Sequence, residues 1–369
     1  WTKTGSIASV KLEYSIDGGA TYPNLVAASV NATTGTPYAW TVPDNPSPTC
    51  RVKITNTADS TIFDTSDANF RIRGSLTITS PNGTEIWIVG ESRNITWTKQ
   101  GAIANAKLEY STDGGTNYPN VIIASTSAAS LTYPWTVPDA IGTTLKVKIT
   151  DVSDATVFDA SDANFIIRGS LTVTSPNGAE IWIVGESRNI TWTKTGSIAN
   201  VKLEYSTDAG LTYPNVIIAS TDATTGIYAW AVADAIGTAL RVKITNVLDN
   251  AVNDVTNANF EIKGSLTLTA PNGGETWTVG STNNITWNRT GSITNVNLKY
   301  SIDGGLSYLN TIVLSAPAAA GSYAWIIPDV IGTQVRVSIT NTDDTTVADT
   351  SNANFKITGS FNLTAPNGG

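Results

Sequence analysis

The sequence predicts an all-β fold, a tandem array of β-sandwich domains of about 95 residues each. Three observations predict it. Tryptophan recurs at a spacing of 95 residues, as at Trp97, Trp192 and Trp287. Many segments between these positions alternate apolar and polar residues, which is the period of a strand with one buried face. Turn signals such as Pro-Asn-Gly separate them, and no stretch carries the apolar stripe of an amphipathic helix.

The limits of the domains follow from this period. The predicted units are residues 1–74, which lack the first strands of a repeat, then 75–169, 170–264 and 265–359, and the first strand of a fifth unit at 360–369. A unit of this length suits one small β domain rather than one coil of a solenoid. We therefore expect each complete unit to bury its own core.

The strands of the second unit can be predicted in order. Its alternating or strand-like segments are 76–79, 85–89, 94–97, 106–110, 145–149 and 164–167. About seven or eight short strands with turns between them are typical of an immunoglobulin-like or fibronectin type III-like sandwich. Tryptophan is the bulkiest candidate for the core of such a domain. The predicted core tryptophans are Trp87, Trp97, Trp135, Trp182, Trp192 and Trp230.

The joins between units are short. Only Gly74-Ser75 separates the last strand of one unit from the first strand of the next, and Gly169-Ser170 and Gly264-Ser265 repeat this join. Two residues allow little independent motion, so we expect a stiff rod of roughly 35–40 Å per domain at about 3.3 Å per strand residue.

The composition excludes several functions. The 369 residues include no His and one Cys, which excludes a Ser-His-Asp triad, an intrachain disulfide and a Cys-based metal cluster. The net charge of −8 argues against nucleic acid and anionic membranes as partners. No run is apolar enough for membrane insertion. We predict no catalytic residue and no cofactor.

An acidic turn recurs in every unit. It reads Ser-Thr-Asp-Gly-Gly-Thr-Asn-Tyr at residues 111–118, and its aspartates are Asp17, Asp113, Asp208 and Asp303. Aspartate caps backbone N–H groups in such hairpins, and glycine supplies a positive φ. The motif resembles the Asp-box of sialidases, with tyrosine in place of the usual tryptophan. That resemblance implies a hairpin turn and no catalytic role.

The order of motifs in the second unit carries a wider resemblance. It runs Ser-Pro-Asn-Gly-Thr-Glu-Ile-Trp at 80–87, Asn-Ile-Thr-Trp at 94–97, Lys-Leu-Glu-Tyr at 107–110 and Ser-Asp-Ala-Asn-Phe at 161–165. This order resembles the N-terminal domain of the fungal Ser/Thr-rich GPI-anchored and yeast cell-wall glucan-synthesis family. Similar domains recur in large secreted prokaryotic proteins. The resemblance implies an extracellular sandwich at a cell surface, without an active site.

Two further groups are weaker candidates. Asp154, Asp159 and Asp162 lie close in sequence, and clustered carboxylates can hold Ca²⁺, although Asp also serves turns. Tyr118 and its counterparts Tyr22 and Tyr213 could stack on sugars if exposed, and could equally pack at a strand edge.

The two ends leave alternatives open. The chain has no Met, begins at Trp1 within a strand-like pattern and ends within a turn. We expect this sequence to be a stretch of a longer array of the same units. Alternatively, a strand containing Phe361 and Leu363 completes the first domain of the next molecule. Either arrangement gives a linear head-to-tail assembly.

These observations together predict a secreted or surface-bound structural repeat protein. It would serve as a fibre, stalk, sheath or adhesin shaft, with copies of itself or further repeats as partners. The alternative is an adhesive module that binds carbohydrate, such as cell-wall glycans, or another surface.

Overall fold

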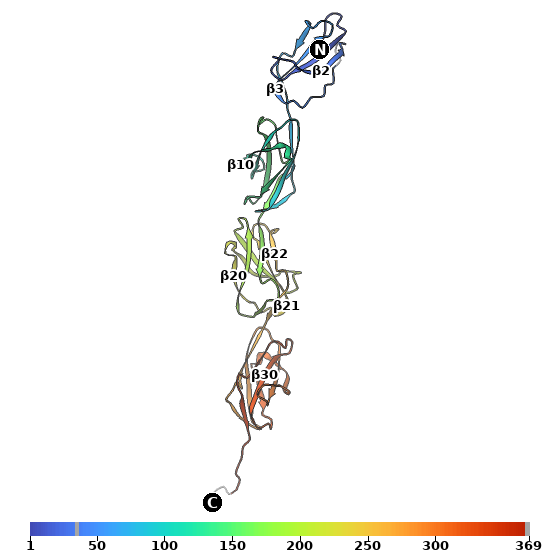
Figure 1. Cartoon of the computed structure of the whole chain (residues 1–369). Coiled ribbons are helices and arrows are strands. Elements are labelled where there is room, and N and C mark those ends of the chain that lie inside the picture. Colours follow the sequence, from blue (N-terminus) through green and yellow to red (C-terminus); the bar gives the residue numbers. More distant parts are fainter. Residues whose placement is uncertain (34–36, 366–369) are drawn as a thin grey trace. The chain divides into compact units, whose positions relative to one another are not determined.

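The computed structural model describes residues 1–33 and 37–365. It is built of strands, and the helical segments within the described residues are three single turns of 3₁₀ helix (Figure 1). These turns are η1 (Ala128–Ser130), η2 (Ala223–Thr225) and η3 (Ala318–Ala320). In the described part of the chain, no helix has the length and apolarity needed to cross a membrane. The predicted all-β fold of tandem sandwiches is confirmed.

The chain divides into two compact units, Trp1–Gly169 and Ser170–Gly369. We call the four predicted domains repeats 1 to 4. Repeat 1 contains β1 (Ser9–Ser15), β2 (Asn24–Asn31), β3 (Ser47–Asn56), β4 (Phe63–Thr65) and β5 (Phe70–Ile72). Repeat 2 contains β6 (Ser75–Ser80), β7 (Ile86–Ile88), β8 (Ser92–Gln100), β9 (Asn105–Ser111), β10 (Asn120–Ser127), β11 (Thr132–Thr136), β12 (Gly142–Asp151), β13 (Phe158–Ala160) and β14 (Phe165–Arg168).

The second unit repeats this order of elements twice. Repeat 3 contains β15 (Ser170–Ser175), β16 (Ile181–Ile183), β17 (Ser187–Thr195), β18 (Asn200–Ser206), β19 (Asn215–Asp222), β20 (Ile227–Ala231), β21 (Gly237–Asn246), β22 (Asn253–Val255) and β23 (Phe260–Lys263). Repeat 4 contains β24 (Ser265–Ala270), β25 (Thr276–Thr278), β26 (Thr282–Thr290), β27 (Asn295–Ser301), β28 (Asn310–Pro317), β29 (Ser322–Ile326), β30 (Gly332–Asn341), β31 (Ala348–Thr350) and β32 (Phe355–Thr358).

Each complete repeat is a two-layer sandwich. In repeat 2, one sheet has the order β11-β8-β6 and the other the order β10-β9-β12-β14-β7, with β13 also paired to β12. Most pairs are antiparallel. The exception is β7, which pairs in parallel with β14 through Ile86↔Ile166, Trp87↔Ile167 and Arg168↔Ile88. Repeats 3 and 4 have the same pairing, so the second and the last strand of each complete repeat lie in one sheet.

Strand β10 has no simple alternation in the sequence. Its pairing with β9 shifts register twice, between Val121 and Ile123 and between Ile123 and Thr126. Each bulge inserts residues that turn the following side chains to the other face. The period of two is lost, and sequence pattern alone therefore missed this strand.

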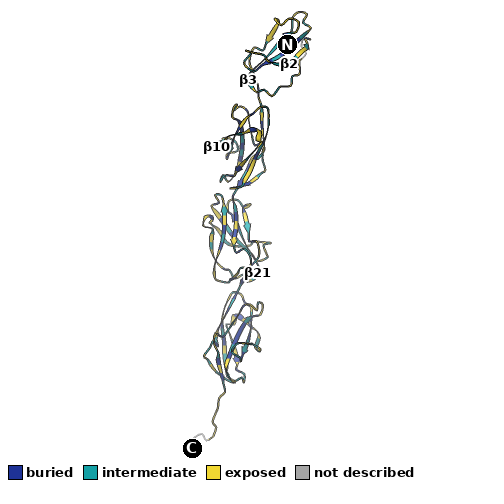
Figure 2. Cartoon of the chain, viewed as in Figure 1, coloured by how far each residue is buried: buried dark blue, intermediate teal, exposed yellow. Residues whose placement is uncertain are grey.

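The core of each complete repeat lies between the two sheets (Figure 2). In repeat 2, Trp97 is almost fully buried, and its indole Nε1–H donates to the Ala128 carbonyl oxygen at 3.0 Å. The ring of Trp87 lies 5.8 Å from that of Trp135 and 5.2 Å from that of Phe165. All six predicted core tryptophans are buried: Trp87, Trp97, Trp135, Trp182, Trp192 and Trp230.

Candidate functional site: the joints and the outer sheet face

The joint between repeats 1 and 2 is close-packed around a glycine. Gly74 lies between β5, which ends at Ile72, and β6, which begins at Ser75. A Cβ atom at Gly74 would lie 2.6 Å from the carbonyl oxygen of Gln100 and 2.8 Å from the Ile103 side chain. Only glycine lets the backbone of the join approach the β8–β9 turn so closely.

Two polar contacts cross the same joint. A carboxylate oxygen of Asp44, in the loop before β3, accepts a hydrogen bond from the backbone N–H of Ala102 at 2.5 Å. On the other side, the guanidinium of Arg73 lies 3.8 Å from the carboxylate of Asp154. Side-chain contacts between repeats 1 and 2 therefore add to the short connection in holding the two repeats together.

The joint between repeats 3 and 4 uses the same positions. Asp234 accepts hydrogen bonds from both the backbone N–H and the hydroxyl of Ser292, the former at 3.0 Å. A Cβ at Gly264 would lie 2.6 Å from the carbonyl oxygen of Thr290. A carboxylate in the preceding repeat and a glycine in the connection thus recur at both joints.

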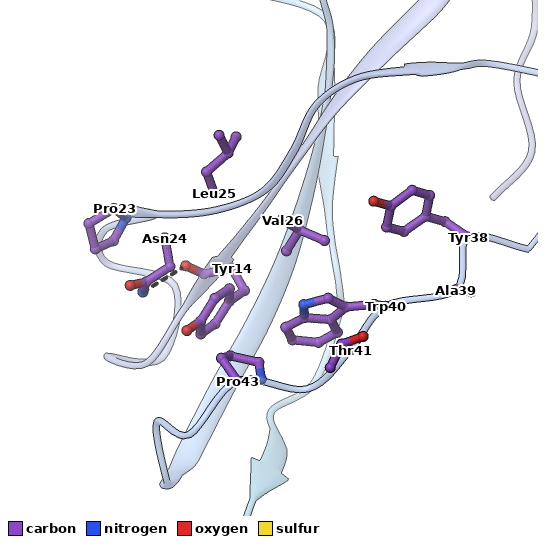
Figure 3. Close-up of a pocket in the computed structure, with 10 residues that line it drawn as sticks. All are labelled: Tyr14, Pro23, Asn24, Leu25, Val26, Tyr38, Ala39, Trp40, Thr41 and Pro43. Atoms are coloured by element: carbon purple, nitrogen blue, oxygen red, sulfur yellow. Dashed lines mark hydrogen bonds between the residues drawn. The ribbon is translucent and has the colours of Figure 1, made fainter.

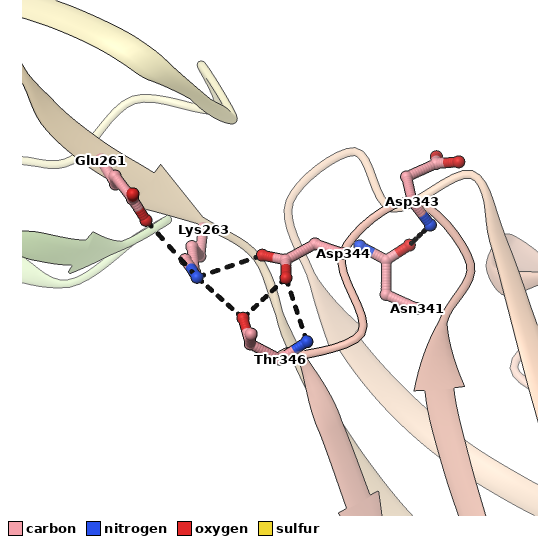
Figure 4. Close-up of polar contacts among 6 residues, drawn as sticks. All are labelled: Glu261, Lys263, Asn341, Asp343, Asp344 and Thr346. Atoms are coloured by element: carbon pink, nitrogen blue, oxygen red, sulfur yellow. Dashed lines mark hydrogen bonds and ion pairs between the residues drawn. The ribbon is translucent and has the colours of Figure 1, made fainter.

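Lys263 is the centre of the second contact at this joint (Figure 4). Its ammonium lies 3.2 Å from the Asp344 carboxylate and 3.4 Å from that of Glu261, and donates to the Thr346 hydroxyl at 2.7 Å. The hydrogen bond with Asp344 raises the pKa of Lys263. The Thr346 hydroxyl, its N–H and Lys263 lower the pKa of Asp344. Both groups are therefore held in their charged forms.

Sequence reasoning predicted the short joins and missed these contacts. The signal was present as residues that recur at a spacing of 95 just before each Gly-Ser and in the loop before β3, β12 and β21. They are Arg73, Arg168 and Lys263, and Asp44, Asp139 and Asp234. Packing of the core explains why an apolar residue recurs every 95 positions. It does not explain a recurring polar residue beside a join, so such a residue indicates a contact at the join.

The predicted hairpin aspartates all accept hydrogen bonds within their own turns. In repeat 2, the carboxylate of Asp113 accepts from the hydroxyl of buried Ser111 at 2.6 Å and from the N–H of Asn117 at 3.0 Å. These hydrogen bonds, of which the one from Ser111 has the largest effect, lower the pKa of Asp113 to about 2. Corresponding bonds lower the pKa of Asp17, Asp208 and Asp303. Each carboxylate is occupied by turn N–H and O–H groups.

The candidate Ca²⁺ ligands contact different partners. Asp154 accepts from Thr156, Asp159 accepts from the N–H of Ile78 at 2.7 Å, and Asp162 accepts from the Asn82 side chain at 2.8 Å. In the described residues, no group of three or more acidic or other ligating side chains is placed to hold a metal ion. These aspartates join strands and loops of the sandwich.

The outer face of the larger sheet carries a repeated stack. In repeat 2, Lys148 lies over the ring of Tyr118 at 5.5 Å and over that of Phe158 at 4.6 Å. The Tyr118 ring is partly buried under this lysine. Repeats 1 and 3 hold the same lysine–tyrosine contact, at 5.5 Å for Lys53 over Tyr22 and 5.6 Å for Lys243 over Tyr213.

A pocket of about 580 Å³ lies in repeat 1 beside Tyr14 and Trp40 (Figure 3). In repeat 2, the counterpart of Trp40 is Trp135 on β11, which pairs with β8. Residues 38–43 of repeat 1 form no strand, and Trp40 packs on Tyr14 at 5.2 Å. The pocket of repeat 1 thus lies at the position that corresponds to β8 in repeat 2. We assign it no ligand.

Phe361 and Leu363 follow β32, the last strand of repeat 4. Both were expected in a strand at 360–369, yet residues 360–365 form no strand and both side chains are exposed. Within the described chain no neighbouring strand is available to pair with them, and residues 366–369 lie outside the described residues.

Comparison with known proteins finds matches among solved structures. No protein-family model matches the chain, and no curated protein matches its sequence. Fibronectin(III)-like modules of Clostridium thermocellum CbhA are 20% identical over 51% of this chain and 94% of theirs, with a TM-score of 0.20. Four N-terminal Ig domains of Dscam1 isoform 1.9 are 10% identical over 95% and 91%, with a TM-score of 0.27. Titin domains I67–I69 are 10% identical over 79% and 100%, with a TM-score of 0.29.

Proposed function

We propose that this chain is an extracellular structural protein whose domains act as stiff spacers. Its role would be that of a fibre, stalk, sheath or adhesin shaft at a cell surface. The observation that carries the proposal is the construction of the joints. A flexible linker would need a longer segment rich in Gly, Ser or Pro. Instead, Gly74 packs against Gln100 and Ile103, and Asp44 and Arg73 hold the next repeat.

The surface supports the same proposal. Only 14% of the residues are charged, against about 25% in typical soluble proteins. Exposed threonine hydroxyls bond to each other across strands, as between Thr79 and Thr96 at 2.7 Å and between Thr174 and Thr191 at 2.7 Å. We assign the chain no catalytic role and no cofactor. Its partners would be further repeats or copies of the same chain.

Electron micrographs of the native material test this proposal. We expect continuous filaments or stalks with an axial repeat of roughly 35–40 Å, the length of one sandwich at about 3.3 Å per strand residue. Spin labels placed on β12 of repeat 2 and β3 of repeat 1 in the full chain should give one narrow distance distribution. A broad distribution, as from domains on loose tethers, would contradict the spacer role.

Head-to-tail joining of separate chains through Phe361 and Leu363 is a second part of this proposal. Strand addition to an exposed sheet edge supplies backbone hydrogen bonds and pockets for alternate side chains. Removal of residues 360–369 should then abolish end-to-end association, measured by light scattering. Association that persists after the removal would exclude this route and leave the spacer role intact.

A further inference from the structure

The outer sheet face of repeat 4 differs from that of the other repeats. In repeat 2, Glu109 at the centre of this face is paired with Lys107 at 2.6 Å, and its backbone pairs with that of Lys148. Repeats 1 and 3 have the same ion pair, between Lys11 and Glu13 and between Lys202 and Glu204. Every central carboxylate of repeats 1 to 3 therefore has a lysine partner.

Repeat 4 replaces every member of this arrangement. Lys299 stands where the other repeats have glutamate, and Asn297 stands where they have lysine. Ser338 replaces the lysine that covers the tyrosine ring, and Ala348 replaces Phe158 of repeat 2. In strand register, Lys299 lies opposite Ser338. Lys299 has no carboxylate within ion-pair distance among the described residues.

A groove of about 510 Å³ lies on β27 and β30, and all four replaced positions line it. The ring of Tyr308 lines it and is not covered by a lysine, because Ser338 is too short to reach across it. Thr340 also lines it. In repeats 1 to 3 the hydroxyls at this position are buried without a hydrogen-bond partner, at Thr55, Thr150 and Thr245. In repeat 4 the corresponding Thr340 is half-buried and lines the groove.

The chemistry of the lining selects a class of ligand. The hydroxyl of Thr340 and the side-chain oxygen of Asn297, whose amide nitrogen donates to the Leu314 carbonyl oxygen at 3.2 Å, match the hydroxyls of a sugar, and the buried Ser338 hydroxyl lies at the base of the groove. The bare face of Tyr308 suits the apolar face of a sugar ring. Lys299, without a carboxylate partner, favours a carboxylate on the ligand. A single lysine is too little charge to hold nucleic acid on a chain of net charge −8.

We propose that repeat 4 binds a polysaccharide that carries carboxylate groups, such as a polyuronate, in the groove formed by Lys299, Tyr308 and Ser338. The sugar ring lies on Tyr308, and its carboxylate takes the place that the glutamate side chain has in repeats 1 to 3. Repeats 1 to 3 cannot bind in this way, because their own glutamate and lysine side chains fill the face. This activity goes beyond the spacer role and does not depend on it.

Affinity electrophoresis of the full chain tests the proposal. The probe is a native gel containing polygalacturonate, compared with a gel containing the neutral polymer pullulan. We expect retardation only in the polygalacturonate gel. Ser338→Lys should weaken it about tenfold or more, by covering Tyr308 as Lys148 covers Tyr118. The pair Asn297→Lys with Lys299→Glu should do the same, by restoring the ion pair of repeat 2.

These variants place on repeat 4 residues that the same sheet already carries in repeat 2, so folding is preserved, as near-ultraviolet circular dichroism would verify. Tyr118→Ala in repeat 2 is the matched control and should leave retardation unchanged. The four substitutions Lys107→Asn, Glu109→Lys, Lys148→Ser and Phe158→Ala should create a second site and increase retardation. Equal retardation in pullulan, no retardation at all, or retardation that Ser338→Lys leaves unchanged would each overturn the proposal.

Discussion

The ammonium of Lys263 lies 3.2 Å from the carboxylate of Asp344, so the last strand of repeat 3 is tied to a loop of repeat 4. Both side chains are less than half exposed, at 17% and 33%. The ion pair therefore has a defined geometry, in contrast to most ion pairs between freely exposed side chains.

Lys263→Ala should loosen this joint. The variant loses the contacts to Asp344 and Thr346, and we expect a broader distribution of distances between spin labels on β21 and β30 in the full chain. Lys356→Ala, at an exposed position of β32, is the control and should leave the distribution narrow. If both variants give the distribution of the unmodified chain, Lys263 does not hold the joint.

The same contact should depend on pH at both extremes. The pKa of Asp344 is lowered in the folded chain, so its stabilising effect is complete above the unfolded value and is lost as pH falls through the folded value. The pKa of Lys263 is raised, so its effect is complete below the unfolded value and is lost as pH rises through the folded one. The distribution of spin-label distances should therefore broaden at low pH and at high pH, and added salt should broaden it at neutral pH.

Gly74→Ala should destabilise the first unit. The added methyl group would lie 2.6 Å from a backbone oxygen that cannot move aside easily, and overpacking of this kind costs about 1–3 kcal/mol. Gly142→Ala is the matched control, because its Cβ would meet the nearest atom at 3.6 Å, an ordinary contact. Urea denaturation compares the two. Equal stability of both variants would show that the joint tolerates a side chain.

Trp97→Phe should destabilise repeat 2 by more than the lost volume alone. The Ala128 carbonyl loses its indole donor in a buried place, and an unsatisfied buried group costs about 1–3 kcal/mol. Trp135→Phe is the comparison, since the described residues supply no hydrogen-bond acceptor for its indole. Thermal unfolding followed by tryptophan fluorescence measures both. A larger effect at Trp135 would contradict this ranking.

The hairpin carboxylates should make the chain sensitive to acid. Hydrogen bonds from Ser111 and Ser206 lower the pKa of Asp113 and Asp208 to about 2 in the folded chain, from 3.8. Their stabilising effect is therefore complete above about pH 4 and is lost as pH falls towards 2. Asp113→Asn with Asp208→Asn should flatten the fall in melting temperature over this window. An unchanged slope would assign the acid sensitivity to other groups.

Sequence pattern was sufficient for the sandwich and its core. Trp97 and Leu108 lie in segments whose alternation is unbroken, and both are fully or almost fully buried. The pattern failed at β10, where two bulges disturb the period, and at the parallel pairing of β7 with β14. Strands of three and four residues are too short to show which neighbour they pair with.

The candidate sites were harder to predict for a different reason. The contact between Lys263 and Asp344 joins residues 81 positions apart in sequence. A basic residue and an aspartate recur at these two positions every 95 residues, but the recurrence alone does not show that they meet across a joint. The groove beside Tyr308 arises from four replacements on three strands, each unremarkable alone. Only the strand register, with Lys299 opposite Ser338, places them on one surface.

The parallel pairing of β7 with β14 has a consequence for a chain under load. In repeat 2 the polypeptide enters at β6 and β7 and leaves at β14, and three successive residue pairs join β7 to β14. Pulling the two ends apart drives these strands in opposite directions along their length, so the rungs must break together rather than one after another. Resistance to forced unfolding is a matter of unfolding rate. We therefore expect repeats 2, 3 and 4, which share this parallel pairing, to unfold slowly when their ends are pulled apart.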